Sequence, residues 1–79
     1  MSELNRLRWL CRRGMKELDI VLLHYLDRHY ARAGAAERLA FARLLEMQDP
    51  DIHALLLGRS FTKDTEISDV IAILRQSRD

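Results

Sequence analysis

Residues 16–32, KELDIVLLHYLDRHYAR, carry the pattern that decides the fold of this chain. Apolar and aromatic side chains recur there every three or four residues, which is the spacing of one face of an α-helix and not the alternation of a strand. This stripe consists of Leu18, Val21, Leu22, Tyr25, Leu26 and His29. The stretch therefore predicts a helix that buries one side against a core and ends before Gly34.

The same spacing continues on both sides of this stretch and predicts four more helices. They span approximately residues 3–12, 35–47, 49–57 and 64–76. Ser2 and Asp49 are good N-caps, Pro50 suits a first helical position, and Gly14 and Gly58 suit helix ends. The expected core residues of these helices are Leu4, Leu7, Leu10, Cys11, Ala36, Ala40, Phe41, Leu44, Leu45, Met47, Ile52, Leu55, Leu56, Ile67, Val70, Ile71 and Leu74.

Length and composition fit one small helical domain. The chain has 79 residues, 48% hydrophobic and 32% charged, and only three Gly and one Pro, too few for the many tight turns of an all-β fold. Because the predicted connections are short, we expect a compact all-α bundle of five helices, with residues 1–79 as a single domain. A core of this size favours a docking surface over a deep substrate cleft.

Cysteine content and the chain start bear on the compartment. Cys11 is the sole cysteine, so no internal disulfide forms, as is usual in a reducing compartment. Apolar runs reach only five residues, at positions 70–74, too few for a signal peptide or a membrane span. We therefore expect a bacterial cytoplasmic protein with no direct membrane insertion.

Charge is unevenly distributed, although the net charge is only +1. Residues 1–16 contain five basic and one acidic residue, a local balance of +4, whereas the rest of the chain is at −3. Arginines and Trp9 on the first helix resemble a surface for phosphates and stacked bases. The nearly neutral total charge argues against a nucleic-acid partner, and this interpretation stays an alternative.

Catalytic and metal-binding patterns are weak. His24 and His29 are five residues apart, which places them about 140° apart around a helix and not on one face. Cys11 lies on an apolar face with no nearby base, and the three glycines stand singly instead of forming a phosphate loop. The sequence therefore predicts no metal site, no stably bound cofactor and no enzymatic activity.

The most unusual segment lies where the first two helices meet. Residues 11–19, CRRGMKELD, place cations, one glycine and two carboxylates around a helix junction. One interpretation is structural: the charges complement the helix dipoles and Gly14 makes the turn. The other is functional: Arg13 and Glu17 are exposed, form at most a weak pair with each other, and offer a partner a fork of donors and an acceptor.

This segment resembles a known family. Residues 13–17, RGMKE, match the RGxxE motif of the SdhE-type flavinylation-promoting assembly factors of succinate dehydrogenase, called succinate dehydrogenase assembly factor 2 in eukaryotes. Residues 9–19, WLCRRGMKELD, look like the whole N-terminal signature, and residues 44–52, LLEMQDPDI, resemble a second block. The resemblance covers nearly the whole chain. Two departures are Leu55 or a neighbour, where many relatives have Trp, and a short tail after Arg78.

The resemblance implies a chaperone-like assembly factor that binds the flavoprotein subunit of succinate dehydrogenase, and often that of fumarate reductase. Such factors promote covalent attachment of FAD to the client without reacting themselves, and a free monomer is expected. The partner-binding residues would be Arg13, Gly14 and Glu17. Secondary positions would be Arg6, Trp9, Arg12, Met15 and Asp19. The other alternative is an antitoxin-like regulatory module that binds a small membrane protein.

Overall fold

Five α-helices and one 3₁₀ turn make up the computed structural model, which describes residues 2–76. The elements are α1 (Glu3–Leu10), α2 (Lys16–Arg28), η1 (Tyr30–Arg32), α3 (Ala35–Leu45), α4 (Asp49–Leu56) and α5 (Thr65–Gln76). No strand occurs between residues 2 and 76, so the predicted all-α, five-helix fold is confirmed. The departure noted after Arg78 lies outside the described residues.

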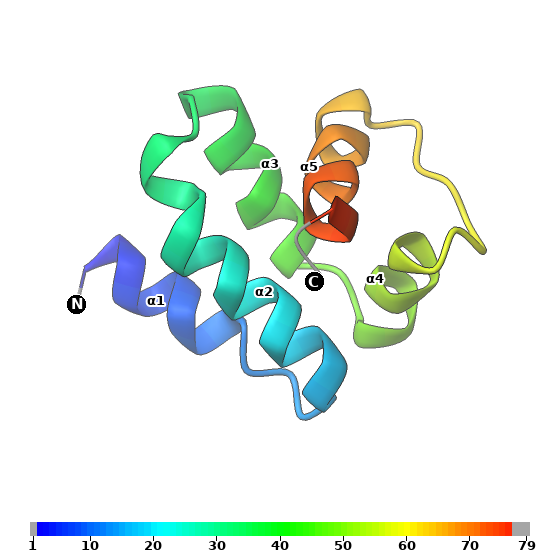
Figure 1. The fold of residues 1–79 in the computed structure, drawn as a ribbon, viewed down its shortest axis with the longest axis horizontal. Coiled ribbons are helices and arrows are strands. Elements are labelled where there is room, and N and C mark those ends of the chain that lie inside the picture. The colour runs from blue at the N-terminus through cyan, green and yellow to red at the C-terminus, as the bar shows by residue number, and fades with distance from the viewer. Residues whose placement is uncertain (1, 77–79) are drawn as a thin grey trace.

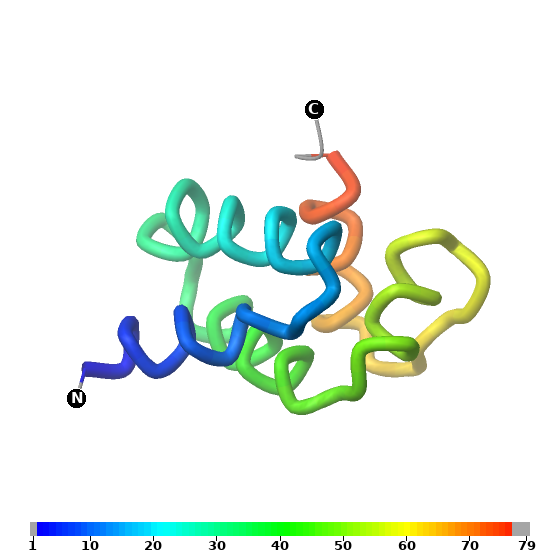
Figure 2. The backbone as a smooth tube through the Cα atoms, turned by 90° about the horizontal axis from the view of Figure 1, so that it is seen from below, coloured from blue at the N-terminus to red at the C-terminus, as the bar shows by residue number. Residues whose placement is uncertain are grey.

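The helices enclose one core, with α1 beside α2 and α3 packed along α5 (Figure 1). Turned by 90°, the molecule shows α4 at one end, joined to α5 by a long loop drawn in yellow (Figure 2). Tyr25 and Phe41 are the largest fully buried side chains, and their ring centroids are 4.4 Å apart. The remaining buried residues are Leu7, Cys11, Leu18, Leu22, Leu26, Ala40, Leu44, Leu45, Ile52, Leu55, Leu56, Ile67, Val70, Ile71 and Leu74.

Tyr25 also brings a polar atom into this core. Its hydroxyl donates a hydrogen bond of 2.5 Å to the Glu37 carboxylate on α3, which satisfies the group that burial would otherwise leave unpaired. Burial raises the pKa of Tyr25, and the Glu37 hydrogen bond and charge raise it further. The hydroxyl therefore remains a donor at neutral pH and ties α2 to α3.

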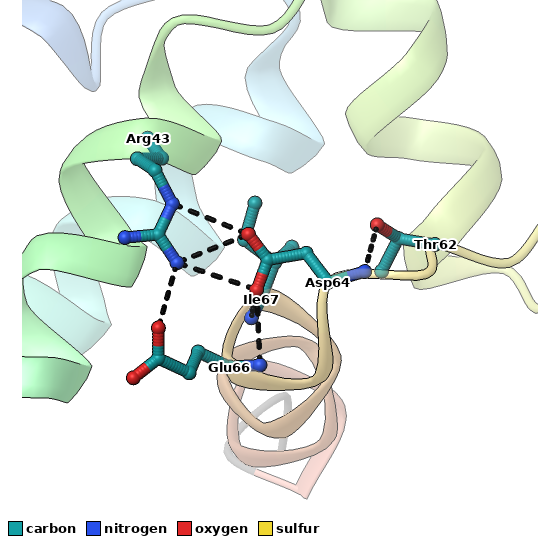
Figure 3. Close-up of polar contacts among 5 residues, drawn as sticks. All are labelled: Arg43, Thr62, Asp64, Glu66 and Ile67. Carbon is teal, nitrogen blue, oxygen red and sulfur yellow. Dashed lines mark hydrogen bonds and ion pairs between the residues drawn. The ribbon is translucent and has the colours of Figure 1, made fainter.

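Side chains hold the start of α5 (Figure 3). The Asp64 carboxylate accepts hydrogen bonds from the backbone N–H groups of Glu66 (3.0 Å) and Ile67 (3.1 Å), which makes it the N-cap. Arg43 on α3 donates to Asp64 at 3.0 Å and to Glu66 at 3.1 Å. The Ile67 N–H bond and the Arg43 guanidinium lower the pKa of Asp64. The cap stays ionised at neutral pH and ties α3 to α5.

Several predicted helix ends were placed too far along the chain. The helix predicted over residues 16–32 ends at Arg28, and the 3₁₀ turn that follows lets the Tyr30 ring pack with its centroid 6.1 Å from that of Phe41. The first and third helices stop two residues early, at Leu10 and Leu45. Gly58, with φ of +75°, follows the end of α4 as predicted.

Two residues expected in the core are exposed. Leu4 lies in the first turn of α1 and keeps 44% of its surface, because no helix covers that end of α1 (Figure 1). Ala36 is exposed in the first turn of α3, where the buried face begins only at Ala40. Leu55 is buried and fills the core, so this position carries an aliphatic core residue.

Candidate partner-binding site

The α1–α2 corner, residues 11–19, joins two helices through a short extended connection (Figure 1, blue). Cys11 is the C-cap of α1, and Met15, in an extended conformation, is the N-cap of α2. Gly14 adopts φ of +82°, a region that glycine enters without the strain other residues meet. A Cβ atom at Gly14 would meet no heavy atom within 4 Å, so open space surrounds its backbone.

Arg13 points inward and joins three segments of the chain. Its Nε donates to Asp49 Oδ1 at 2.7 Å, and its Nη1 donates to the carbonyl oxygens of Leu10 (3.2 Å) and Leu45 (2.6 Å). Nη2 donates to the carbonyl oxygen of Met47. Four of the five N–H groups of the guanidinium are thereby used, and the side chain is 13% exposed.

The expectation that Arg13 is exposed is therefore wrong, and its guanidinium binds Asp49 where at most a weak pair with Glu17 was expected. The carbonyl oxygens at the C-terminal end of α3 lack helical partners and carry negative partial charge, so they attract a cation strongly. Asp49 supplies the full counter-charge, with a side chain that is 29% exposed. This contact joins the RGMKE motif to the Asp-Pro-Asp block, although the two residues are 36 positions apart.

Asp49 has a different role from the predicted N-cap. It is the first residue of α4, Pro50 is the second, and Gln48 takes the cap position without a side-chain hydrogen bond. The predicted start of this helix is correct within one residue. The Asp49 carboxylate, however, binds Arg13 instead of the α4 backbone. Asp49 was thus missed as a partner of Arg13, and its presence in the second block was the available signal.

Asp19 fixes the corner from the other side. Its Oδ1 accepts a hydrogen bond of 2.7 Å from the backbone N–H of Arg13. Met15 is half-buried and packs against the core. Asp19 and Met15, predicted as secondary contact residues, therefore both hold the connection in place.

Glu17 is exposed, as predicted, and lies on the first turn of α2. Its side chain is 79% exposed, and Oε2 lies 3.6 Å from Nε2 of His53 on α4. An exposed contact of this kind contributes only ~0–1 kcal/mol to stability. The Glu17 carboxylate therefore remains available to a partner, and His53 is the neighbour that sequence reasoning did not associate with it.

The remaining predicted residues line the outside of α1 and its end. Trp9 is 70% exposed, a large aromatic surface for a small domain. Arg6 is exposed and pairs with Glu3 at 3.2 Å. The Arg12 side chain is exposed and has no hydrogen bond or ion pair with residues 2–76. The corner thus separates an inward Arg13 from an outward Arg12 and Glu17.

Cys11 is fully buried, and burial raises the pKa of its thiol to about 12. Because only the thiolate reacts readily, we expect iodoacetamide to alkylate the folded protein at least about a hundredfold more slowly than the urea-unfolded chain. Equal alkylation rates for the folded and unfolded protein would contradict this placement.

The same shift gives a pH dependence. The folded thiol binds its proton more tightly than a thiol with the ordinary value of 9.0. Stability from this group is complete below that pH and is lost as pH rises towards the folded value of about 12. Urea unfolding curves should therefore show a free energy of unfolding that falls as the pH rises above 9.0. Because Cys11→Ala removes the thiol, the free energy of unfolding of this variant should fall less steeply over the same pH range.

Neither a membrane span nor a metal site is found among residues 2–76. No helix there is both long and apolar enough to cross a bilayer. No three His, Cys, Asp or Glu side chains gather there as ligands for a metal ion. The imidazole rings of His24 and His29 lie 6.4 Å apart.

Comparisons with known proteins place the chain in a family. A family model described as the flavinator of succinate dehydrogenase matches residues 5–78. The FAD assembly factor SdhE of Methylococcus capsulatus is 45% identical over 75 residues, covering 95% of this chain and 90% of that protein. The FAD assembly factor SdhE of Yersinia pestis is 38% identical over 74 residues, with coverages of 94% and 83%. Since the model and both relatives match nearly the full length, the chain belongs to the flavinator of succinate dehydrogenase family.

Proposed function

We propose that this chain binds the flavoprotein subunit of succinate dehydrogenase in the bacterial cytoplasm and promotes covalent attachment of FAD to it. Family membership supports the client and the reaction. The observation that carries the proposal is the α1–α2 corner, where internal contacts hold Arg13 and leave Glu17 79% exposed. A carboxylate on a fixed backbone can orient a partner without an added cost in backbone entropy.

In this proposal the chain positions its client and does not react. Two clefts among residues 2–76 have volumes of about 180 and 300 Å³, at or below the ~300–1,000 Å³ typical of small-molecule sites. These sizes favour a FAD group held by the client. Holding the client in a reactive arrangement lowers the barrier to bond formation without a catalytic side chain.

Within the corner, Arg13 takes the role of a positioning residue. Its contacts with Asp49 and the α3 carbonyls fix the backbone next to Gly14, and one N–H remains for the client. Gly14 permits close approach of the client backbone, and Glu17 supplies the exposed charge.

A pull-down with the tagged chain tests the partner. We expect the tagged chain to capture a large flavoprotein subunit. Glu17→Ala should reduce the amount of this subunit that is captured, although the tagged variant should remain folded. Capture of a small membrane protein would support the antitoxin-like alternative, and nuclease-sensitive material would support a nucleic-acid binder. Repeating the binding assay with the purified flavoprotein subunit of fumarate reductase tests the second proposed client.

Gly14 offers a prediction with an internal control. Because its φ is +82° and its surroundings are open, Gly14→Ala should cost only about 1 kcal/mol of stability. Gly58→Ala is the matched control, since Gly58 has φ of +75° and lies beside Arg75 on α5. Melting curves should show similar small losses for both variants.

Function should depend on the bulk at position 14. Gly14→Val, which adds bulk at the corner, should strongly reduce covalent flavin on the client, whereas Gly34→Val, at another glycine with open space around it, should not. Full flavin attachment by a folded Gly14→Val protein would show that the client does not approach this backbone.

A further inference from the structure

A second surface lies between α5 and the loop that follows α4. A cleft of about 180 Å³ opens there beside residues 57–64. Its lining residues are Leu55, Gly58, Ser60, Phe61, Thr62, Ser68, Ile71, Ala72 and Arg75. The floor is aliphatic and the rim carries three hydroxyl groups, so the cleft suits an apolar group with polar neighbours.

Phe61 makes this cleft unusual. The side chain is 91% exposed, although it is among the residues that line the cleft. Single exposed apolar residues are common, but an exposed aromatic ring at the edge of an apolar cleft is a typical anchor of a protein interface. An apolar side chain inserted here would contact Phe61 and Ile71, which both line the cleft.

The charge around the cleft is positive. The side chains of Arg59, Lys63 and Arg75 have no hydrogen-bond or ion-pair partner among residues 2–76. The Arg75 guanidinium lies over Gly58, with Nη2 3.9 Å from where a Cβ would be. Of the nearby carboxylates, Asp64 and Glu66 are both paired with Arg43, and Asp69 is exposed on α5, which leaves a net charge of +1 for these four residues and the three cations. The remaining charge calls for an acidic ligand.

We propose that this cleft, the α4–α5 cleft, binds a segment of a partner protein that carries an apolar side chain flanked by carboxylates. A cavity of about 180 Å³ is below the ~300 Å³ lower end for small-molecule sites, so one side chain fits better than a cofactor. The loop (yellow) and the α1–α2 corner (blue) lie at different edges of the molecule (Figure 1). The two surfaces can therefore be occupied independently.

NMR titration of the ¹⁵N-labelled full chain tests the proposal. The probe is a blocked pentapeptide with a central leucine between two pairs of aspartates. We expect saturable shifts at residues 55–62 and 68–75 below ~1 mM peptide. A peptide with alanine in place of leucine, and one with asparagines in place of the aspartates, should each bind about tenfold more weakly, because each lacks one of the two recognised features.

Variants assign the binding to named side chains. Phe61→Ser and Arg75→Gln should each weaken binding of the leucine peptide about tenfold, whereas Arg32→Gln, an exposed arginine on η1, should not. Phe61 and Arg75 are both exposed, so these two variants should fold. Their NMR spectra without peptide, compared with that of the wild-type chain, will verify this. The proposal is overturned if the shifts do not saturate, if they map elsewhere, or if the alanine peptide binds equally well.

Discussion

Replacing Arg13 with alanine is expected to destabilise the protein severely. The substitution removes four hydrogen bonds and leaves Asp49 and the carbonyl oxygens of Leu45 and Met47 without their partner. Losing one side of a largely buried charged network costs about 2–4 kcal/mol. In a domain this small that loss lowers the melting temperature by roughly 10–30 °C, measurable by circular dichroism.

Two further variants make this result specific. Arg13→Lys keeps the charge but has no planar fork, so it should recover only part of the lost stability. Arg12→Ala is the matched control, because that neighbouring side chain is exposed and unpaired among residues 2–76. An Arg13→Ala protein that melts like Arg12→Ala would show that the inward network contributes nothing measurable.

Replacing Glu17 with alanine is expected to give the opposite combination, a stable protein that has lost its function. The side chain is 79% exposed, and its single contact with His53 is 3.6 Å long. If the client desolvates this carboxylate, its loss weakens binding by about 2–4 kcal/mol, roughly 30- to 1,000-fold. Affinity for the purified flavoprotein subunit measures this effect, beside a melting curve that should be unchanged.

Asp69→Ala provides the comparison for Glu17. It removes another exposed carboxylate, on α5, and thus the same formal charge. We expect full client affinity for this variant. Glu17→Gln, which keeps the shape and removes the charge, should resemble Glu17→Ala. Equal affinities for the Glu17 and Asp69 variants would mean that general charge, and not the corner, governs the interaction.

The helices could be predicted from the spacing of apolar residues, because that spacing reflects which side chains are buried. Leu18, Leu22 and Tyr25 repeat at helical spacing, and each is buried. Helix ends were less predictable, since they depend on contacts between distant residues. The helix predicted to continue past Arg28 stops there because packing of Tyr30 on Phe41 favours a tight turn. Local propensity contains no information on that contact.

The candidate site was predicted in position but not in detail. The exposure of Glu17 follows from its place on the polar face of α2, and the positive φ of Gly14 follows from its place in a turn. The inward direction of Arg13 depends on Asp49, 36 residues away, and on carbonyl oxygens at the end of α3. Only the folded chain brings those acceptors together, so no local pattern could reveal them.

Covalent flavin on the client is the most direct test of the proposed function. The flavoprotein subunit of succinate dehydrogenase is isolated from cells that lack their own assembly factor, with and without this chain, and in-gel fluorescence measures attached FAD. We expect strong fluorescence with the wild-type chain and little with Glu17→Ala at equal protein levels. Equal fluorescence with the wild-type chain and with no chain would contradict it.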